Sequence, residues 1–587
     1  MTEEIQDIFD EIRNIMQPDM DCTARYHALD ALLLRALKDR TRHSPVDFTH
    51  TAARLHWLCK QTGHPSHPLE VFRARAGRIQ KGLFLPDGED EAYDLKAVCE
   101  GLAAFYQTHV PEDVQKRLPR HWRPAPAPAE KGPQAKRIRI TVHRWDEHFI
   151  YGKDHTHPTE QLLKVEYTDE TDRTFADLKE QLYEGAQLNL LSVKTIKAEG
   201  AYPYVLKPEM LVLDPDFLID ITALCACIKP YGYSAYTHLL NKFAPPARSA
   251  AIQLGNAANQ FLDDCVNENR DLERAKTSEN EVFRLGSAER ERFIQNRDLE
   301  REDRACPESA GRERFIQNAD GTAEAELYLR SMQNSFRISP LAWSTLPDID
   351  RDFFNRCEMQ FRHIRQTVRN SFSAAGIDIR KTEVELEPSF LCEALGLQGR
   401  MDLLTRNADK LVELKSGKAD EYPYRSPKDE HRLQMALYKE ILYYNLDRRH
   451  EQVQSYLFYS RYPGLYAVDV PRSHIRRVMA LRNAILHIEH RLRRGESRAL
   501  IGELTEERLN VDGRGDRLYT RYLRPRMMEI LTPLHGMRGA EADYFHRFLT
   551  FTAREQFRAK VGDDRADSPG GFSETWCCDT PVSYTHL

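Results

Sequence analysis

The sequence predicts a multidomain α+β protein, because its hydrophobic pattern changes more than once along the chain. Residues 1–118 contain amphipathic helical stretches such as YHALDALLLRALKDR. From Lys136 to about residue 216 the apolar residues alternate with period 2, in runs such as RIRITVH and LLKVEY, which predicts about five short strands. The run from Gly396 to Lys418 indicates two more strands, and a helical pattern follows it.

These changes divide the chain into parts with separate cores. The segment PRHWRPAPAPAEKGPQA is rich in proline and alanine and predicts a stiff linker. The short strands after it predict a small β-barrel of the OB type. We expect a helical N-terminal domain (1–118), the linker (119–135), the barrel (136–216), a mixed core (217–470) with a charged insert (281–330), an Arg-rich helical region (471–579) and a non-native tail (580–587). Within the insert, ERFIQN occurs twice, which indicates a tandem duplication without assigned function.

Composition limits the class of protein. Of the 587 residues, 41% are hydrophobic and 30% are charged, as in soluble globular proteins. No apolar run approaches the roughly 18 residues that cross a membrane, and the acidic start MTEEIQDIFDEIRN is unlike a signal peptide. We therefore expect a cytoplasmic protein without a membrane partner. The eleven cysteines are scattered, which argues against a secreted disulfide framework, and we interpret Cys225 and Cys227 as buried thiols.

The net charge of −6 gives no overall signature of nucleic-acid binding, but positive charge is concentrated locally. Residues 471–530 contain fourteen arginines and no lysine against eight acidic residues. Arginine forks onto phosphates and stacks on bases, which suits single strands. A solvated face of an amphipathic helix explains the same residues at least as well.

The strongest chemical pattern is the run GLQGRMDLLTRNADKLVELKSGK, from Gly396 to Lys418. We interpret 397–404 and 411–414 as the strands of a hairpin that turns at 406–409. Asp402 lies on the first strand, and Glu413 and Lys415 lie two residues apart on one face of the second. Two carboxylates and an ammonium that converge in this way suit Mg²⁺ or Mn²⁺, which activates water and neutralises charge on a phosphate.

Each of these residues also has an ordinary explanation, such as a cross-strand ion pair between Glu413 and Lys415. The ordered set favours a site. It includes Glu387, fifteen residues before Asp402, and the helix EHRLQMALYKEILYY, in which His431, Gln434 and Tyr438 share one face. We expect Gln434 and Tyr438 to hold substrate, although a core aromatic with a solvated neighbour is the alternative.

These motifs resemble the PD-(D/E)XK nucleases, in particular their RecB-like branch. The resemblance rests on GRMD (Asp402), the E-x-K of VELKSGK (Glu413 and Lys415) and the later Q-x-x-x-Y (Gln434 and Tyr438). The nuclease part of the Okazaki-flap nuclease-helicases is especially similar, because there too a glutamate precedes a GLxGxxD strand. The resemblance implies a central mixed sheet flanked by helices, a Mg²⁺- or Mn²⁺-dependent deoxyribonuclease, and single-stranded or flapped DNA as the partner.

The chain departs from this family at two points. The family has a histidine ligand four residues after a helix-start glycine, whereas Asn259 follows Gly255 here, so Asn259 is a candidate ligand or a structural residue. The flap nuclease-helicases hold an iron-sulfur cluster, whereas no cysteine lies between Cys392 and Cys577 here, so we expect no cluster.

Further domains and other functions stay open at this stage. A helicase would follow in the resembling family, but no G-x-x-x-x-G-K-[ST] loop occurs here, so we expect any motor domain in a longer natural chain. The alternatives to a replication or repair nuclease are a binding module that has lost its activity, and another RecB-like exonuclease that acts in CRISPR adaptation or recombination.

Overall fold

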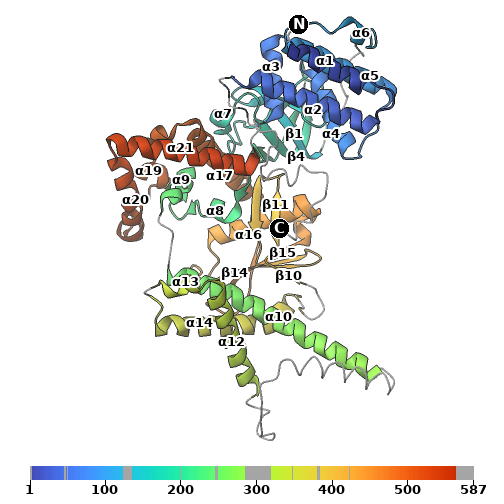
Figure 1. The fold of residues 1–587 in the computed structure, drawn as a ribbon. Helices are drawn as coiled ribbons and strands as arrows, with labels where there is room; N and C mark the ends of the chain where they lie inside the picture. The colour runs from blue at the N-terminus through green and yellow to red at the C-terminus, as the bar shows by residue number, and fades with distance from the viewer. Residues whose placement is uncertain are drawn as a thin grey trace. The chain divides into compact units, whose positions relative to one another are not determined.

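The structure is a computed structural model, shown in Figure 1, and it contains both helices and sheets. It describes residues 3–44, 46, 48, 50–122, 135–198, 200–244, 249–284, 319–346, 348–377, 379, 384–421 and 424–562. The chain forms two compact units, which we describe separately. Unit 1 contains Met1–Phe243, Leu391–Gln398 and Pro471–Leu587, and unit 2 contains Ala244–Phe390 and Gly399–Val470.

Unit 1 begins with a helical bundle, as the amphipathic pattern predicts. Its helices are α1 (Glu3–Ile15), α2 (Cys22–Thr41), α3 (Thr51–Thr62), α4 (His67–Gln80), α5 (Gly88–Phe105) and α6 (Glu112–Gln115). The carboxylate of Asp21 accepts backbone N–H groups at the start of α2, and Asp87 does the same for α5, so both helices begin at a capping residue. Leu33, Phe72 and Val98 lie in the fully buried core.

A closed five-stranded barrel follows in unit 1, which confirms the small barrel expected from the period-2 runs. Its strands are β1 (Ala135–Trp145), β2 (Phe149–Asp154), β3 (Leu163–Glu166), β4 (Gln187–Lys197) and β5 (Tyr204–Lys207). They pair in the order β1-β2-β3-β5-β4, and β4 pairs with β1 to close the barrel. The β3–β5 pair is parallel. A short helix, α7 (Leu178–Gln181), lies between β3 and β4 in sequence, and β6 (Met210–Leu213) adds to β4.

The rest of unit 1 comes from two distant parts of the sequence. The first part contributes β7 (Ile219–Asp220), α8 (Ile221–Cys225), β8 (Ile228–Lys229), β9 (Gly232–Tyr233) and α9 (Ala235–Phe243). The second contributes α17 (Arg472–Arg494), α18 (Ser497–Glu503), α19 (Glu506–Leu509), η3 (Tyr519–Leu523), α20 (Arg524–Gly536) and α21 (Gly539–Val561). Cys225 and Cys227 are buried thiols, as expected.

Arg482 joins these parts of unit 1. It lies on α17, is completely buried, and donates hydrogen bonds to the backbone oxygens of Leu213, Asp214, Phe217 and Gly396. Gly396 has a φ of +60°, and a side chain there would collide with the Arg482 guanidinium. Glycine is therefore required at this position for two reasons, its backbone conformation and the close approach of Arg482.

Unit 2 packs helices against a five-stranded mixed sheet. Its helices are α10 (Ala250–Arg284), α12 (Ala319–Ile338), α13 (Pro340–Ser344), α14 (Arg351–Gln366), η1 (Thr367–Ser371), α15 (Phe372–Ala374), α16 (Asp429–Leu446) and η2 (His450–Gln452). The sheet order is β10 (Val384–Leu386), β13 (Leu403–Thr405), β14 (Lys410–Lys415), β15 (Gln454–Tyr459) and β16 (Tyr466–Val468). Only the β14–β15 pair is parallel, and α16 connects these two strands in sequence. Phe261, Phe361 and Val412 lie in the common core.

The predicted hairpin is only partly correct. The turn and the second strand form as expected, but the stretch 397–404 is not one strand. It divides into β12 (Leu397–Arg400), which belongs to a sheet with β11 (Ser389–Cys392) and β7, and β13, which belongs to the sheet of unit 2. The break coincides with backbone hydrogen bonds to an earlier stretch, because the Asp402 carbonyl oxygen accepts the Glu387 N–H (3.0 Å) and the Met401 N–H donates to the Pro388 oxygen (3.1 Å). Asp402 therefore lies in a link between two strands.

Some predictions fall outside the described residues. These are the two ERFIQN repeats at 291–296 and 313–318, most of the linker, and the tail at 580–587. Among the helices that are described, none combines the length and the apolar character needed to cross a bilayer.

Candidate functional site

Asp402 and Glu413 lie next to each other in unit 2. Glu413 is on β14 and is almost completely buried. Asp402 precedes β13, and its Oδ2 accepts the backbone N–H of Leu414 at 2.6 Å. Burial and the neighbouring Glu413 charge raise the pKa of Asp402 well above its usual value, although Lys415 and the Leu414 N–H oppose this shift. The two carboxylates thus repel each other wherever both are ionised.

Lys415 and Gln434 both bind the same oxygen of Glu413. The Lys415 Nζ lies 2.8 Å from Glu413 Oε1, which confirms that residues 413 and 415 share a face of the strand. Gln434 Nε2 donates to this Oε1, also at 2.8 Å. The other oxygen, Oε2, is buried and has no hydrogen-bond partner among the described residues. One oxygen of this carboxylate is therefore fixed by the protein, and the other is buried without a protein partner among the described residues.

Gln434 and Tyr438 are one turn apart on α16, and both are buried, at 3% and 1% relative exposure. Gln434 Nε2 lies 3.0 Å from the Tyr438 hydroxyl, which donates to the backbone oxygen of Arg400 at 2.7 Å. The structure brings both predicted residues to Glu413, but their hydrogen bonds go to protein groups. The expectation that they contact substrate stays a prediction.

Glu387 lies at the edge of this cluster. It has a φ of +50°, which is uncommon for a residue with a side chain, and its Oε2 accepts Arg400 Nη1 at 3.0 Å. Its charge contributes to the raised pKa of Asp402. Glu387 is therefore close enough to influence Asp402, while a hydrogen bond and ion pair with Arg400 hold its carboxylate.

Asp263 is a member of the cluster that the sequence did not single out. Burial first, and then the charges of Glu387 and Asp264, raise its pKa to about 7. It lies on α10, one turn after Asn259 and two turns after Gly255, so it shares a helix face with both. This spacing was the only signal in the sequence, because nothing local indicates that Glu387 folds back near this helix.

Gly255 places α10 close to the end of β14. A side chain added at Gly255 would lie 3.3 Å from the Ser416 Oγ, one residue after Lys415. Asn259, one turn further along the helix, is partly exposed, and its side chain makes no hydrogen bond within the described part of the chain. Its role as a metal ligand stays a prediction.

His431 also belongs to the neighbourhood of Lys415. Its Nδ1 lies 2.8 Å from the Tyr459 hydroxyl. Burial first, and then the charges of Lys415 and Lys428, lower its pKa to about 3. The imidazole is therefore neutral at physiological pH, and the neighbouring ammonium group of Lys415 is paired with the Glu413 carboxylate.

The carboxylate oxygens of Asp402 and Glu413 can be compared with the ligands that a divalent cation requires. Hard cations such as Mg²⁺ take carboxylate oxygens. The unpartnered Oε2 of Glu413 and the raised pKa of Asp402 both fit such an ion, because a positive charge there would relieve the repulsion between the carboxylates. Within the described residues, no group of three or more His, Cys, Asp or Glu side chains is arranged to hold a metal ion.

The Arg-rich segment is mostly engaged inside unit 1. Arg476 pairs with Asp172, Arg491 with Glu496 and Glu503, and Arg524 with Glu506. Arg482 is buried. Other arginines lie over aromatic rings, among them Arg477, Arg493, Arg494 and Arg508. The local excess of positive charge thus stabilises the fold at many positions, and only some of its guanidinium groups face solvent.

Comparison with known proteins assigns no family to the chain. No protein-family model matches it, and comparison with curated proteins returned no match. The support for a function therefore comes from the arrangement of Asp402, Glu413 and Lys415 and from the order of the motifs around them.

Proposed function

We propose that the chain is a metal-dependent deoxyribonuclease of the PD-(D/E)XK class, RecB-like branch. The sheet of unit 2 supports this class, because the antiparallel strands β10, β13 and β14 carry the acidic motif and β15 runs parallel to β14 after the helix α16. The order of the motifs supports it as well. Glu387, Asp402, Glu413, Lys415 and then Gln434 and Tyr438 follow one another as in that class.

One observation carries the proposal. Two neighbouring carboxylates, Asp402 and Glu413, lie beside one ammonium group, and one buried oxygen of Glu413 has no protein partner. A structural ion pair between Glu413 and Lys415 would not need the second carboxylate, whose charge disfavours the arrangement. A site that binds a cation needs both.

The residues have distinct roles in this proposal. Asp402 and Glu413 would hold the Mg²⁺ or Mn²⁺, which supplies charge neutralisation at the phosphate and a more acidic water. Lys415 orients the attacking water or stabilises negative charge on the phosphate. Gln434 is a positioning residue, because its hydrogen bond fixes Oε1 of Glu413, while the buried Oε2 has no protein partner among the described residues. The Tyr438 hydroxyl in turn accepts a hydrogen bond from Gln434 and donates one to the Arg400 backbone oxygen, so it holds Gln434 in place.

The substrate in this proposal is single-stranded or flapped DNA. The motif resemblance to the flap nuclease-helicases supports it, and so does the closed five-stranded barrel of unit 1, since five-stranded barrels of the OB type bind single strands. A helicase in a longer natural chain, and a role in DNA replication, repair or recombination, belong to the same proposal.

A binding module without catalytic activity is the second candidate. Asn259 favours it, because an amide stands where the resembling family has a metal-binding imidazole. The two candidates predict the same DNA binding but different outcomes on incubation with a metal.

The experiment is incubation of the purified chain with end-labelled single-stranded, flapped and duplex DNA in the presence of Mg²⁺, Mn²⁺ or EDTA. We expect cleavage of the single-stranded or flapped DNA with either metal and none with EDTA. Binding without cleavage under all metal conditions would support the inactive module. Cleavage that persists in EDTA would exclude a metal-dependent nuclease.

A further inference from the structure

Unit 1 contains a large cavity outside the carboxylate cluster. Its volume is about 820 Å³, and its walls come from α7, the start of α9, the first half of α17 and α19. Phe175, Leu178 and Leu481 are buried residues that line it with apolar surface. Small-molecule sites generally occupy about 300–1,000 Å³ and combine apolar walls with a few polar groups. The cavity therefore has the size and the lining of a site for one ligand of moderate size.

Arg477 and Arg508 are the cations of this cavity. Two other arginines near the start of α17 bind acidic groups of the barrel region, Arg472 with Glu209 and Arg476 with Asp172. Arg477 differs from them, because neither it nor Arg508 has a side-chain hydrogen bond or ion pair within the described part of the chain. Both side chains are exposed. Their N–H donors are therefore free to bind a ligand.

Aromatic rings hold the two guanidinium groups in place. The Arg477 guanidinium lies over the Tyr233 ring, 4.1 Å from its centroid, and that of Arg508 lies 5.7 Å from the centroid of Tyr236. Tyr236 is itself fixed, because its hydroxyl donates to Glu503 at 2.6 Å. Stacking on a ring orients a guanidinium without using its N–H groups. A guanidinium group oriented in this way can donate two parallel hydrogen bonds to one phosphate.

The cavity also offers acceptors. Asp177 and Glu507 line it, and both are exposed. A simple inorganic anion would gain from the arginines but not from these carboxylates, and it would leave the apolar wall unused. A ligand that has a phosphate, amino or hydroxyl donors and a flat apolar face would use all three parts of the lining. A nucleotide has this chemistry.

We propose that this cavity binds one nucleotide, whose phosphate is held by Arg477 and Arg508 and whose base lies against the apolar wall. The nucleotide is either free or one unit of a single strand, since both present the same groups. The proposal does not depend on the nuclease activity of unit 2.

The test measures binding by the purified chain in EDTA, so that cleavage does not interfere. The probes are dAMP, deoxyadenosine, inorganic phosphate and a labelled single-stranded oligothymidylate. We expect the double variant Arg477→Ala, Arg508→Ala to weaken binding of dAMP or of the oligonucleotide by about 10- to 100-fold, because two charged hydrogen-bond donors are lost. The matched control is Arg517→Ala, Arg526→Ala, which removes the same charge from two exposed arginines that do not line the cavity. It should change affinity by about two-fold or less.

A second variant protects the test against loss of folding. Ala480→Trp fills the cavity and keeps both arginines, and Ala480 is one of its lining residues. It should weaken binding of dAMP more than binding of inorganic phosphate, with an unchanged melting temperature.

The outcomes distinguish a free nucleotide from a unit of a single strand, and they distinguish the cavity proposal from the nuclease proposal. Binding of dAMP that the double variant loses assigns a free nucleotide, and loss of oligonucleotide binding alone assigns a strand. Equal weakening by both double variants, deoxyadenosine that binds as tightly as dAMP, or unchanged dAMP and oligonucleotide binding in Ala480→Trp would overturn the proposal. Asp402→Asn should leave dAMP binding unchanged, so that failure of the nuclease proposal and failure of this one are distinguishable.

Discussion

Asp214 in unit 1 and Asp402 in unit 2 are both enclosed by protein, but their pKa values shift in opposite directions. Burial raises the pKa of each carboxyl group. At Asp214 the hydrogen bond with His490 and the close contact with His50 outweigh burial, so its pKa lies well below the usual value. At Asp402 the neighbouring Glu413 adds to burial, so the pKa is well above it.

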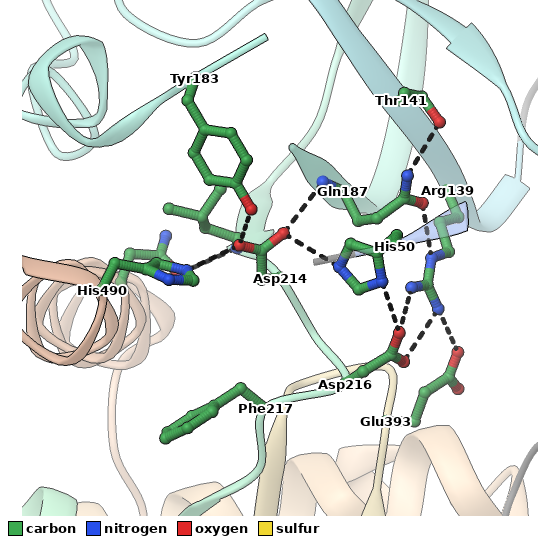
Figure 2. A network of polar contacts seen from close by, with 12 residues as sticks. His50, Arg139, Thr141, Tyr183, Gln187, Asp214, Asp216, Phe217, Glu393 and His490 are labelled. Carbon is green, nitrogen blue, oxygen red and sulfur yellow. Dashed lines mark hydrogen bonds and ion pairs between the residues drawn. The ribbon is translucent and has the colours of Figure 1, made fainter. Parts of the chain in front are cut away.

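Figure 2 shows why the pKa of Asp214 is low. Its carboxylate accepts hydrogen bonds from the Gln187 backbone N–H (3.0 Å), the Tyr183 hydroxyl (2.5 Å) and His490 Nε2 (2.8 Å), and His50 Nε2 lies 3.4 Å away. Asp402 accepts one backbone N–H. An acid whose oxygens are all bound by the protein stabilises a fold, whereas an acid with few donors and a charged neighbour is prepared for a ligand.

The same contrast applies to the neighbours of the two acids. Next to Asp214, Asp216 binds the Arg139 guanidinium through two oxygens (3.1 and 2.5 Å), and Glu393 lies 3.5 Å from the same guanidinium (Figure 2). Next to Asp402, Glu413 keeps one unpartnered oxygen. The comparison therefore predicts that substitutions in the first network reduce stability and that substitutions in the second reduce activity.

The largest expected effect is on cleavage. Asp402→Asn and Glu413→Gln keep the shape of each side chain but remove a charge, so each should reduce DNA cleavage by about a thousand-fold or more. Gel assays of cleavage and of DNA binding in EDTA measure this, and binding should be retained. Asp429→Asn, an exposed acid on α16, is the control and should be normal. Full activity in either site variant would remove that residue from the site.

The next effect is on the stability of unit 1. Asp214→Ala leaves His490 and the Gln187 N–H buried without a partner, so it should lower the free energy of unfolding by about 3–5 kcal/mol. Urea denaturation measures this change. Asp543→Ala, which removes an exposed ion pair with Arg498, should cost about 1 kcal/mol or less. Equal costs for the two variants would show that the Asp214 network is not a source of stability.

A smaller effect is expected from the residues that fix Glu413. Gln434→Ala and Tyr438→Phe should each lower cleavage by about 10- to 100-fold, as the loss of groups that orient a metal ligand does. Steady-state cleavage rates and melting temperatures measured together test this. Tyr424→Phe, at an exposed tyrosine of the same unit, is the control for loss of a hydroxyl. A lowered melting temperature with unchanged specific activity would make Gln434 and Tyr438 structural residues only.

The smallest effect is a pH dependence with opposite sign at the two acids. The folded pKa of Asp402 is raised, so its contribution to stability is present at low pH and is lost as the pH rises through that pKa. The folded pKa of Asp214 is lowered, so its contribution is present above the unfolded pKa of about 3.9 and is lost as the pH falls. Without metal, Asp402→Asn should therefore gain stability relative to the native chain by about 1.4 kcal/mol per pH unit between the unfolded and folded pKa values.

Urea denaturation in EDTA at several pH values measures this gain, and added Mg²⁺ should reduce it. A gain that does not change with pH would contradict the assigned direction of the Asp402 shift. Asp214→Asn should show the opposite trend, with its cost falling as the solution becomes acidic.

Features set by neighbouring residues could be predicted from the sequence. The period-2 runs predicted the barrel, and the spacing of Glu413 and Lys415 predicted their common face. In each case the signal, an alternation or a spacing of residues, lies within one short stretch of the sequence.

Features set by contacts between distant residues could not be predicted from the sequence. Nothing near Gly396 indicates that Arg482 binds its oxygen, because 86 residues separate them. The break at Asp402 depends on the backbone of Glu387, and the raised pKa of Asp263 depends on the same residue. The Arg-rich segment also looks uniform in sequence, although Arg482 is buried and Arg477 faces a cavity.

The way in which unit 1 is assembled has a consequence for how the chain is made. The ribosome needs about 10–45 s, at roughly 5–20 residues per second, to synthesise residues 244–470, which lie between the barrel and α17. During this time His490 and Arg482 do not yet exist, so Asp214 lacks its His490 partner, and the backbone oxygens of Leu213 and Phe217 lack the Arg482 guanidinium. The last long helices therefore complete contacts of a barrel that was synthesised first.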